Sequence, residues 1–218
     1  NGDTATTEVP FTVTIASDAI GDEDTAIDLF IDTDTSNPIT IANVPDGATL
    51  SAGTDNGDGT WTVAPEDING LTITPPNDDA TDMPLQITID GATTDFDVVV
   101  NVVADDPTVG GGLATGEEDT AIPLNLSAGL TDLDGSEVLS VTITDVPPGS
   151  VLSAGTDNGD GTWTVDPADL ADITLTPPAG FDGSISLNMV ATSTDTDPET
   201  GTTDTATSTL PFTVVVND

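Results

Sequence analysis

A thirteen-residue segment occurs twice in this chain without a single change. The sequence SAGTDNGDGTWTV spans Ser51–Val63 and returns 102 positions later at Ser153–Val165. The similarity extends upstream, since Ile39–Val63 matches Val141–Val165 at the same offset. A separation of this length is close to the usual size of one domain. We therefore predict that the chain arose by tandem duplication of one folding unit.

The two copies define the domain boundaries that we expect. One domain is predicted over residues 1–104 and a second over residues 105–218. The segment Asp3–Val13 resembles Asp204–Val214, which lies at the end of the second copy rather than at its beginning. Residues 1–18 are therefore interpreted either as the last strand of a preceding repeat or as a first strand of similar pattern. Both interpretations imply an array of more than two repeats.

The local pattern predicts an all-β fold. Short runs such as FTVTI, TWTV, LQITI, FDVVVNVV and ISLNMVAT are rich in β-branched residues, and clusters of Gly, Pro, Asn and Asp separate them. No helical period persists for ten residues. About seven strands per hundred residues is typical of an immunoglobulin-like sandwich. We predict two tandem immunoglobulin-like (cadherin-like) Greek-key β-sandwiches in a rod.

The repeated segment predicts a hairpin in each copy. Its centre, TDNGDG, contains an Asn-Gly and an Asp-Gly pair, which favour tight turns between strands. We expect SAG to end one strand and TWTV to begin the next. The short pieces PEDI and PADLAD are predicted to form single helical turns.

The charge of the chain requires a partner from outside it. Forty Asp and Glu residues occur with no Lys, Arg or His, so the formal net charge is −40. Such a chain repels itself, and salt screens that repulsion only beyond about 8–10 Å. Carboxylate and carbonyl oxygens are the ligands of Ca²⁺, which we predict as the cofactor. The alternative is a solvated acidic surface neutralised by diffuse sodium ions.

The same charge excludes several partners. Binding of nucleic acid or of an anionic membrane surface needs cationic side chains, so neither is expected. The chain has no Cys and therefore no disulfide. It also lacks His, Lys, Arg and Tyr, which removes most catalytic bases and nucleophiles, and we predict no enzymatic activity and no small-molecule substrate. Trp61 and Trp163 are interpreted as packing residues of the hairpin or core, with stacking on a sugar as the alternative.

The strongest candidate calcium ligands lie in the sequence TDLDGSE. Asp132, Asp134 and Glu137 alternate along this loop, and Gly135 permits a tight bend. Acids in such a loop can direct oxygens at one cation, and a later Glu can complete the ligand shell. The spacing is not that of an EF-hand. The alternative is a polar turn with solvated acids.

Further candidates occur at the linker and in other loops. One cation at the junction of the units is predicted to gather Asp105 or Asp106, Glu118 and the Asp132/Asp134 loop, against the alternative of an ordinary acidic linker. A second ion is predicted at three alternating acids. These are Asp195, Asp197 and Glu199. In the first unit the equivalent loop keeps Asp32 and Asp34 but has no counterpart of Glu137, so its site is expected to be weaker or differently built. Glu23, in the segment GDEDT, is a further candidate.

These segments together resemble a known repeat type. EEDTAIPLNLSAGLTDLDGSEVLSVTITDVPPGSVLSAG, DGTWTV, GFDGSISLNMVATSTD and FTVVVND are similar to the tandem repeats of giant bacterial RTX adhesins, and the resemblance covers nearly the whole chain. It implies calcium-bound immunoglobulin- or cadherin-like extender domains, secreted by a type I system and retained at the cell surface. The first unit departs from the pattern because it is seven residues shorter at the TDLDGSE loop.

The resemblance and the charge lead to one functional expectation. The chain is expected to be a monomeric, extracellular spacer of a biofilm-type adhesin, which calcium stiffens and which projects a distal ligand-binding domain. Its partners are then the neighbouring repeats of the same polypeptide. The alternatives are a carbohydrate- or peptide-binding module of an adhesin, and an accessory sandwich domain of a secreted polysaccharide-degrading enzyme.

Overall fold

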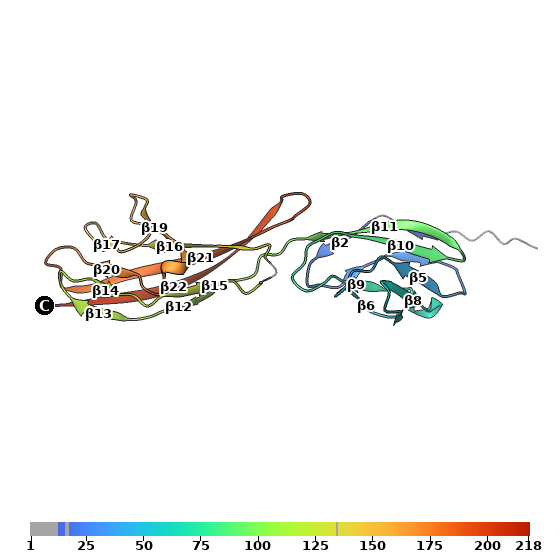
Figure 1. The fold of residues 1–218 in the computed structure, drawn as a ribbon, viewed down its shortest axis with the longest axis horizontal. Coiled ribbons are helices and arrows are strands. Elements are labelled where there is room, and N and C mark those ends of the chain that lie inside the picture. The colour runs from blue at the N-terminus through green and yellow to red at the C-terminus, as the bar shows by residue number, and fades with distance from the viewer. Residues whose placement is uncertain (1–12, 16–17, 134) are drawn as a thin grey trace, which may run out of the picture. The chain divides into compact units, whose positions relative to one another are not determined.

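The computed structural model describes residues 13–15, 18–133 and 135–218, and the chain forms two compact units (Figure 1). Unit 1 comprises Asn1–Val102 with Asp197–Gly201, and unit 2 comprises Val103–Thr196 with Thr202–Asp218. The tandem β-sandwich fold predicted from the sequence is confirmed in both.

Unit 1 is built almost entirely of short strands. Their bounds are β1 (Val13–Ile15), β2 (Ala19–Asp22), β3 (Ile27–Asp28), β4 (Ile31–Thr33), β5 (Ile39–Ala42), β6 (Thr49–Leu50), β7 (Thr54–Asp55), β8 (Thr60–Val63), β9 (Thr72–Thr74), β10 (Met83–Ile89) and β11 (Ala92–Asn101). A 3-10 turn, η1 (Pro65–Asp67), follows β8.

Unit 2 repeats this order of elements. Its strands are β12 (Thr108–Gly110), β13 (Ala114–Glu117), β14 (Ile122–Pro123), β15 (Ser127–Gly129), β16 (Val138–Thr144), β17 (Val151–Leu152), β18 (Thr156–Asp157), β19 (Trp163–Val165), β20 (Thr174–Thr176), β21 (Gly183–Thr196) and β22 (Thr203–Asn217). The 3-10 turn η2 (Pro167–Asp169) follows β19, and the Asp166 side chain caps its start.

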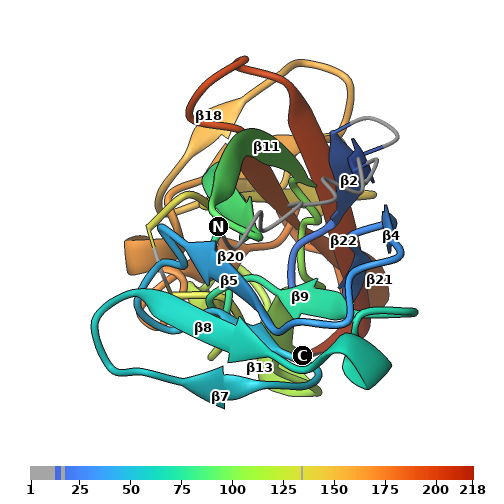
Figure 2. The ribbon, with the colours of Figure 1, turned by 90° about the vertical axis from the view of Figure 1, so that its right-hand side faces the viewer.

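The two units share one sheet topology. In unit 1 a six-stranded sheet has the order β2-β11-β10-β5-β8-β7 and a three-stranded sheet has the order β3-β9-β6; β5, β8 and β7 can be followed in Figure 2. In unit 2 the corresponding orders are β13-β22-β21-β16-β19-β18 and β14-β20-β17. The first strand of each large sheet runs parallel to the last strand of its unit, whereas the other pairings are antiparallel. This is the Greek-key arrangement of an immunoglobulin-like sandwich.

Each unit has its own hydrophobic core. In unit 1 the core includes Ile41, Ile73 and Phe96, and in unit 2 it includes Ile143, Leu175 and Met189, all almost fully buried. Alternate residues of the long strands point inward, as the period of two in the sequence requires. Two separate cores are expected of two units that each close their own sandwich.

The repeated segment forms the predicted hairpin in both units. Strands β7 and β8 pair through Asp55 and Trp61, and β18 and β19 pair through Asp157 and Trp163. The prediction that the preceding SAG segment ends a strand is corrected, because this segment forms a bend in both units. Gly53 has a φ angle of 105°, which takes the chain out of the extended conformation.

Helical structure is confined to single turns. The described residues contain η1 and η2, each of three residues, where PEDI and PADLAD were expected to turn. None of the helices among these residues has the length or the apolar character to cross a membrane.

Candidate metal centre

The linker that enters unit 2 is held by side chains of that unit. The Asp105 backbone N–H donates to Glu137 Oε1 at 2.8 Å, and Ser193 Oγ donates to the Asp105 carbonyl oxygen. One residue earlier, the Ala104 N–H donates to Asp204 Oδ2 at 3.1 Å. Short backbone contacts with carboxylates and a hydroxyl therefore fix the position of the Asp105 region.

The register of the large sheet brings Glu137 and Asp195 to one place. Val138 is paired with Thr194 at the start of β16, so Glu137, one residue earlier, comes next to Asp195, one residue later on β21. Both side chains are buried, with exposed fractions of 6% for Glu137 and 1% for Asp195. Two residues that lie 58 positions apart thus place their carboxylates in the interior of unit 2.

Each of these two carboxylates has one oxygen without a partner in the described part of the chain. Glu137 Oε1 accepts from the Asp105 N–H, and Asp195 Oδ1 accepts from the Thr196 N–H at 2.7 Å. Glu137 Oε2 and Asp195 Oδ2 are buried and accept no hydrogen bond within the described residues. A buried charged oxygen without a partner costs several kcal/mol unless a proton or a cation neutralises it.

The surrounding charges are all negative. Burial raises the pKa of Glu137, and the nearby carboxylates of Asp132, Asp105 and Asp195 raise it further, whereas the hydrogen bond from the Asp105 N–H lowers it. Asp132 is itself buried, with an exposed fraction of 6%. Because the chain has no Lys, Arg or His, no side chain can supply the missing positive charge. We call Asp105, Asp132, Glu137 and Asp195 the acidic group of unit 2.

The donor atoms of this group are those that hard cations prefer. Carboxylate and carbonyl oxygens are the ligands of Ca²⁺, and an unpartnered oxygen on each of two buried carboxylates fits such an ion. Among the described residues, which leave out Asp134, no three carboxylates are already gathered as the ligands of one metal. The residues fit a calcium ion in chemical type, and they would have to move together to enclose it.

Of the other predicted ligands of unit 2, Asp106 stays beside the acidic group and Glu118 lies at the opposite end of the unit. Asp106 is exposed, and its carbonyl oxygen accepts from Thr131 Oγ1 at 2.7 Å. The Glu118 N–H donates to the carbonyl oxygen of Asn217, at the far end of β22. At that end, Gly183 of β21 pairs with Val216 of β22. Asp195 lies twelve residues further along β21, and at about 3.3 Å per residue this end of the strand is roughly 40 Å from Asp195. The predicted grouping of Glu118 with the Asp105 region is therefore corrected.

Asp195 is separated from the two other acids that were predicted to share a second ion with it, Asp197 and Glu199. Asp195 points inward, whereas Asp197 Oδ1 accepts from the N–H groups of Glu199 and Thr200, both at 2.8 Å, and so closes a turn. Glu199 is exposed. Asp195 belongs to the acidic group of unit 2, which corrects its predicted assignment to a site with Asp197 and Glu199.

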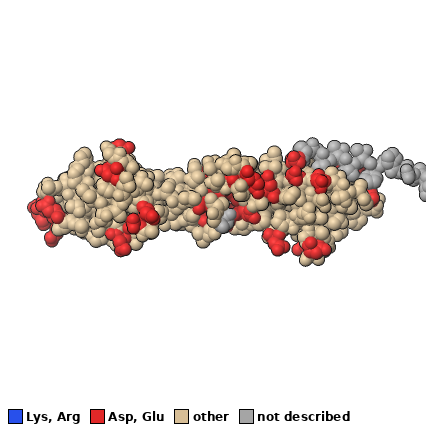
Figure 3. Space-filling view, turned by 45° about the horizontal axis from the view of Figure 1, so that its top comes forward, with Lys and Arg blue, Asp and Glu red and all other residues tan. Residues whose placement is uncertain are grey.

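The predicted ligands of unit 1 do not form a comparable group. Asp32 on β4 and Asp34 after it are exposed. Glu23 is buried, with an exposed fraction of 3%, and its N–H donates to the Asn101 carbonyl oxygen at 3.1 Å. Asp134 lies outside the described residues. Figure 3 shows the acidic side chains of one face of the molecule in separate red groups and no basic ones.

Sequence reasoning missed Ser193, although its signal was present. Along β21 the inward positions Ile185, Leu187, Met189 and Ala191 are apolar, and the same alternation continues to Ser193 and Asp195. A polar residue at an inward position must find a partner. That alternation separates Asp195, which is buried, from the other acids of its loop.

Among known proteins, the chain is similar only to solved structures, and at low sequence identity. No family model matches the chain, and no curated protein matches it. Among solved structures, the endo-fucoidan hydrolase MfFcnA4 from glycoside hydrolase family 107 is 18% identical with a TM-score of 0.29, and the match covers 82% of this chain and 23% of that one. The chain thus spans about a quarter of that protein.

Two further structures match most of the chain. Drosophila N-cadherin EC1-4 is 14% identical with a TM-score of 0.30, over 95% of this chain and 50% of that one. DIP-gamma IG1+IG2 is 9% identical with a TM-score of 0.37, over 96% of this chain and 97% of that one.

Proposed function

We propose that this chain is a spacer of a calcium-dependent bacterial surface adhesin, built from immunoglobulin-like domains that follow one another along one polypeptide. The observation that carries the proposal is the pair of buried carboxylates, Glu137 and Asp195. Each has an oxygen without a partner among the described residues, in a chain without cationic side chains. The resemblance of the sequence to RTX adhesin repeats supports the same reading. Type I secretion, retention at the cell surface and the monomeric state are parts of this proposal.

Calcium would act here as the missing positive charge. Asp132, Glu137 and Asp195 would offer carboxylate oxygens, and the linker segment that contains Asp105 would be drawn to the same place. A bound ion would supply electrostatic neutralisation, while the chain's own residues hold the linker through the Asp105 N–H and carbonyl. The role is mechanical, and the proposal includes no catalytic step.

The affinity of such a site for Ca²⁺ limits how much the ion can stabilise the folded domain. Extracellular modules bind Ca²⁺ with a dissociation constant of roughly 0.1–1 mM. At ten times that constant, one site adds about 1.4 kcal/mol to the free energy of unfolding. In a domain of this size, that corresponds to a rise in melting temperature of roughly 5 °C. The chain would therefore be looser in a low-calcium cytoplasm than outside the cell.

The test is thermal unfolding in calcium and in chelator, followed by circular dichroism. We expect 5 mM CaCl₂ to raise the melting temperature relative to EGTA, and Glu137→Gln and Asp195→Asn to remove most of that rise. Glu117→Gln is the matched control, because Glu117 is exposed in the same unit and loses the same charge. An unchanged melting temperature, or a full calcium effect in both site variants, would overturn the proposal.

A further inference from the structure

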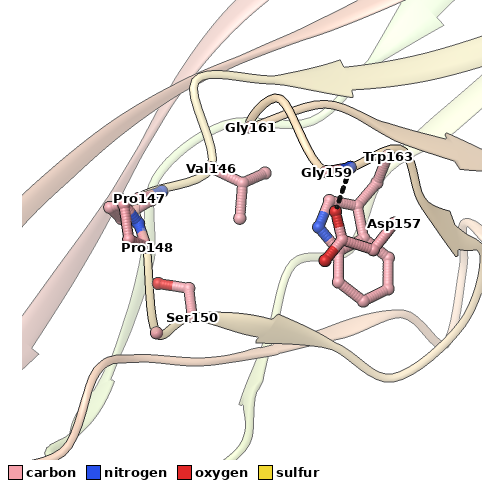
Figure 4. Close-up of a pocket in the computed structure, with 9 residues that line it drawn as sticks. Val146, Pro147, Pro148, Ser150, Asp157, Gly159, Gly161 and Trp163 are labelled. Atoms are coloured by element: carbon pink, nitrogen blue, oxygen red, sulfur yellow. Dashed lines mark hydrogen bonds between the residues drawn. The ribbon is translucent and has the colours of Figure 1, made fainter.

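The repeated hairpin forms one wall of a pocket that occurs in both units. In unit 2 the pocket has a volume of about 160 Å³ and lies between the 146–150 turn and the β18–β19 hairpin (Figure 4). In unit 1 the same segments, around Pro45 and Trp61, enclose about 120 Å³. None of the four acids of the acidic group of unit 2 lines either pocket.

Asp157 and Trp163 lie next to each other on the hairpin wall of the unit 2 pocket. They are cross-strand partners, so both side chains stand on the same face of the sheet. Asp157 Oδ1 accepts from the Gly159 N–H at 2.8 Å, the dashed line in Figure 4. Within the described residues its Oδ2 accepts no hydrogen bond. The pocket thus combines a half-buried indole with a fixed carboxylate that can still accept.

Ser150 and two prolines form the opposite wall. The Ser150 N–H donates to the Pro147 carbonyl oxygen at 3.0 Å, which fixes the turn. Its side-chain Oγ is buried and has no hydrogen-bond partner within the described residues. Buried hydroxyls normally find a partner, so an unpartnered one in a pocket wall needs an explanation. The equivalent residue in unit 1 is Ala48, which has no hydroxyl.

The side chains that line the pocket of unit 2 indicate which chemical class of ligand it can bind. An indole packs against the C–H groups of a sugar ring, and a carboxylate and a hydroxyl exchange hydrogen bonds with sugar hydroxyls. The net charge of −40 repels anionic ligands. A volume of about 160 Å³ is below the roughly 300–1,000 Å³ of pockets for drug-sized ligands, which limits the ligand to one sugar residue. We propose that the pocket of unit 2 binds a neutral monosaccharide unit, with Asp157, Trp163 and Ser150 as its contacts.

The two tryptophans place one fluorescent side chain in each pocket. The chain has two Trp and no Tyr, and both Trp side chains line the pockets. In Trp61→Phe the signal comes only from unit 2, and in Trp163→Phe only from unit 1. We would titrate both variants of the full chain with glucose, galactose, mannose, fucose and N-acetylglucosamine, and with glycerol as the control. For Trp61→Phe we expect a saturable change with at least one sugar and a dissociation constant in the millimolar range.

Two further substitutions assign the contacts. In the Trp61→Phe background, Asp157→Asn keeps an oxygen for the Gly159 N–H but loses the second acceptor, and we expect at least tenfold weaker binding. Ser150→Ala should weaken binding about threefold or more. Conversely, Ala48→Ser in the Trp163→Phe background should strengthen binding in unit 1. Circular dichroism confirms that each variant is folded.

The proposal fails if no sugar gives a saturable change up to 100 mM in folded Trp61→Phe. It also fails if glycerol reproduces the change, or if Asp157→Asn leaves the affinity unaltered. The titrations are run both in CaCl₂ and in EGTA. The sugar-binding proposal can therefore fail while the calcium effect persists, and the calcium effect can be lost while sugar binding persists.

Discussion

The ionisation of an acidic side chain depends on its surroundings, as Glu137 shows. Forty acids occur in the chain, yet Glu137 and Asp195 are the ones whose buried oxygens lack partners among the described residues. Burial and neighbouring carboxylates raise the pKa of Glu137, which means that the folded state favours its protonated form. A cation would reverse that preference, because it stabilises the ionised form.

A pH-dependent comparison follows from this raised pKa. In EGTA, Glu137 contributes stability below its unfolded-state pKa, and this contribution is lost as pH rises through the higher folded-state pKa. Glu137→Gln should therefore be more stable than the wild type at pH 7 in EGTA, by about 1–3 kcal/mol, and the difference should shrink toward pH 4. In calcium we expect the wild type to be more stable than Glu137→Gln. Urea unfolding at both pH values measures the differences, and a pH-independent difference in EGTA would contradict the assignment.

The repeated hairpin shows how a short element can depend on one glycine. Gly155 precedes β18 with a φ angle of 95°, and a Cβ atom there would lie 2.6 Å from the Thr164 carbonyl oxygen. Gly53, its counterpart in unit 1, has the same type of conformation and a distance of 2.8 Å to the Thr62 carbonyl oxygen. The glycine is thus needed for close approach of two backbones as well as for its φ angle.

Gly155→Ala is expected to destabilise unit 2 more than Gly159→Ala. At Gly159 the φ angle is 82°, but a Cβ atom would meet nothing within 4 Å, so only the conformational cost of about 1–2 kcal/mol applies. Gly155→Ala adds a backbone clash and should cost about 1–2 kcal/mol more. Urea unfolding followed by Trp163 fluorescence in Trp61→Phe compares the two. Equal losses would show that the hairpin relieves the clash by shifting.

The two units of the molecule share a topology but differ in their buried acids. Each has a separate hydrophobic core and the same order of strands. Unit 2 buries Asp132, Glu137 and Asp195, whereas the loop acids of unit 1, Asp32 and Asp34, are exposed. The two units therefore share the packing of the sandwich and differ in the burial of their loop acids.

This difference predicts that calcium stabilises the two units unequally. Thermal unfolding of Trp61→Phe reports unit 2, and that of Trp163→Phe reports unit 1. We expect 5 mM CaCl₂ to raise the midpoint of unit 2 by roughly 5 °C or more relative to EGTA, and to raise that of unit 1 by less. Each variant is its own control, since only the calcium changes. Equal rises in both variants would argue that calcium acts through general screening of charge.

Much of the architecture could be predicted because it rests on local signals and on duplication. The period of two in the strands, the Asn-Gly turns and the repeated segment indicated tandem sandwiches. The absence of cationic residues led us to expect a cation from outside the chain, which stays a prediction. The location of the acidic group could not be predicted in the same way. Strand register, which depends on packing between distant segments, brings Glu137 to Asp195 and separates Glu118 from both. The tertiary structure therefore determines which few of the forty acidic side chains are buried and lose their hydrating water.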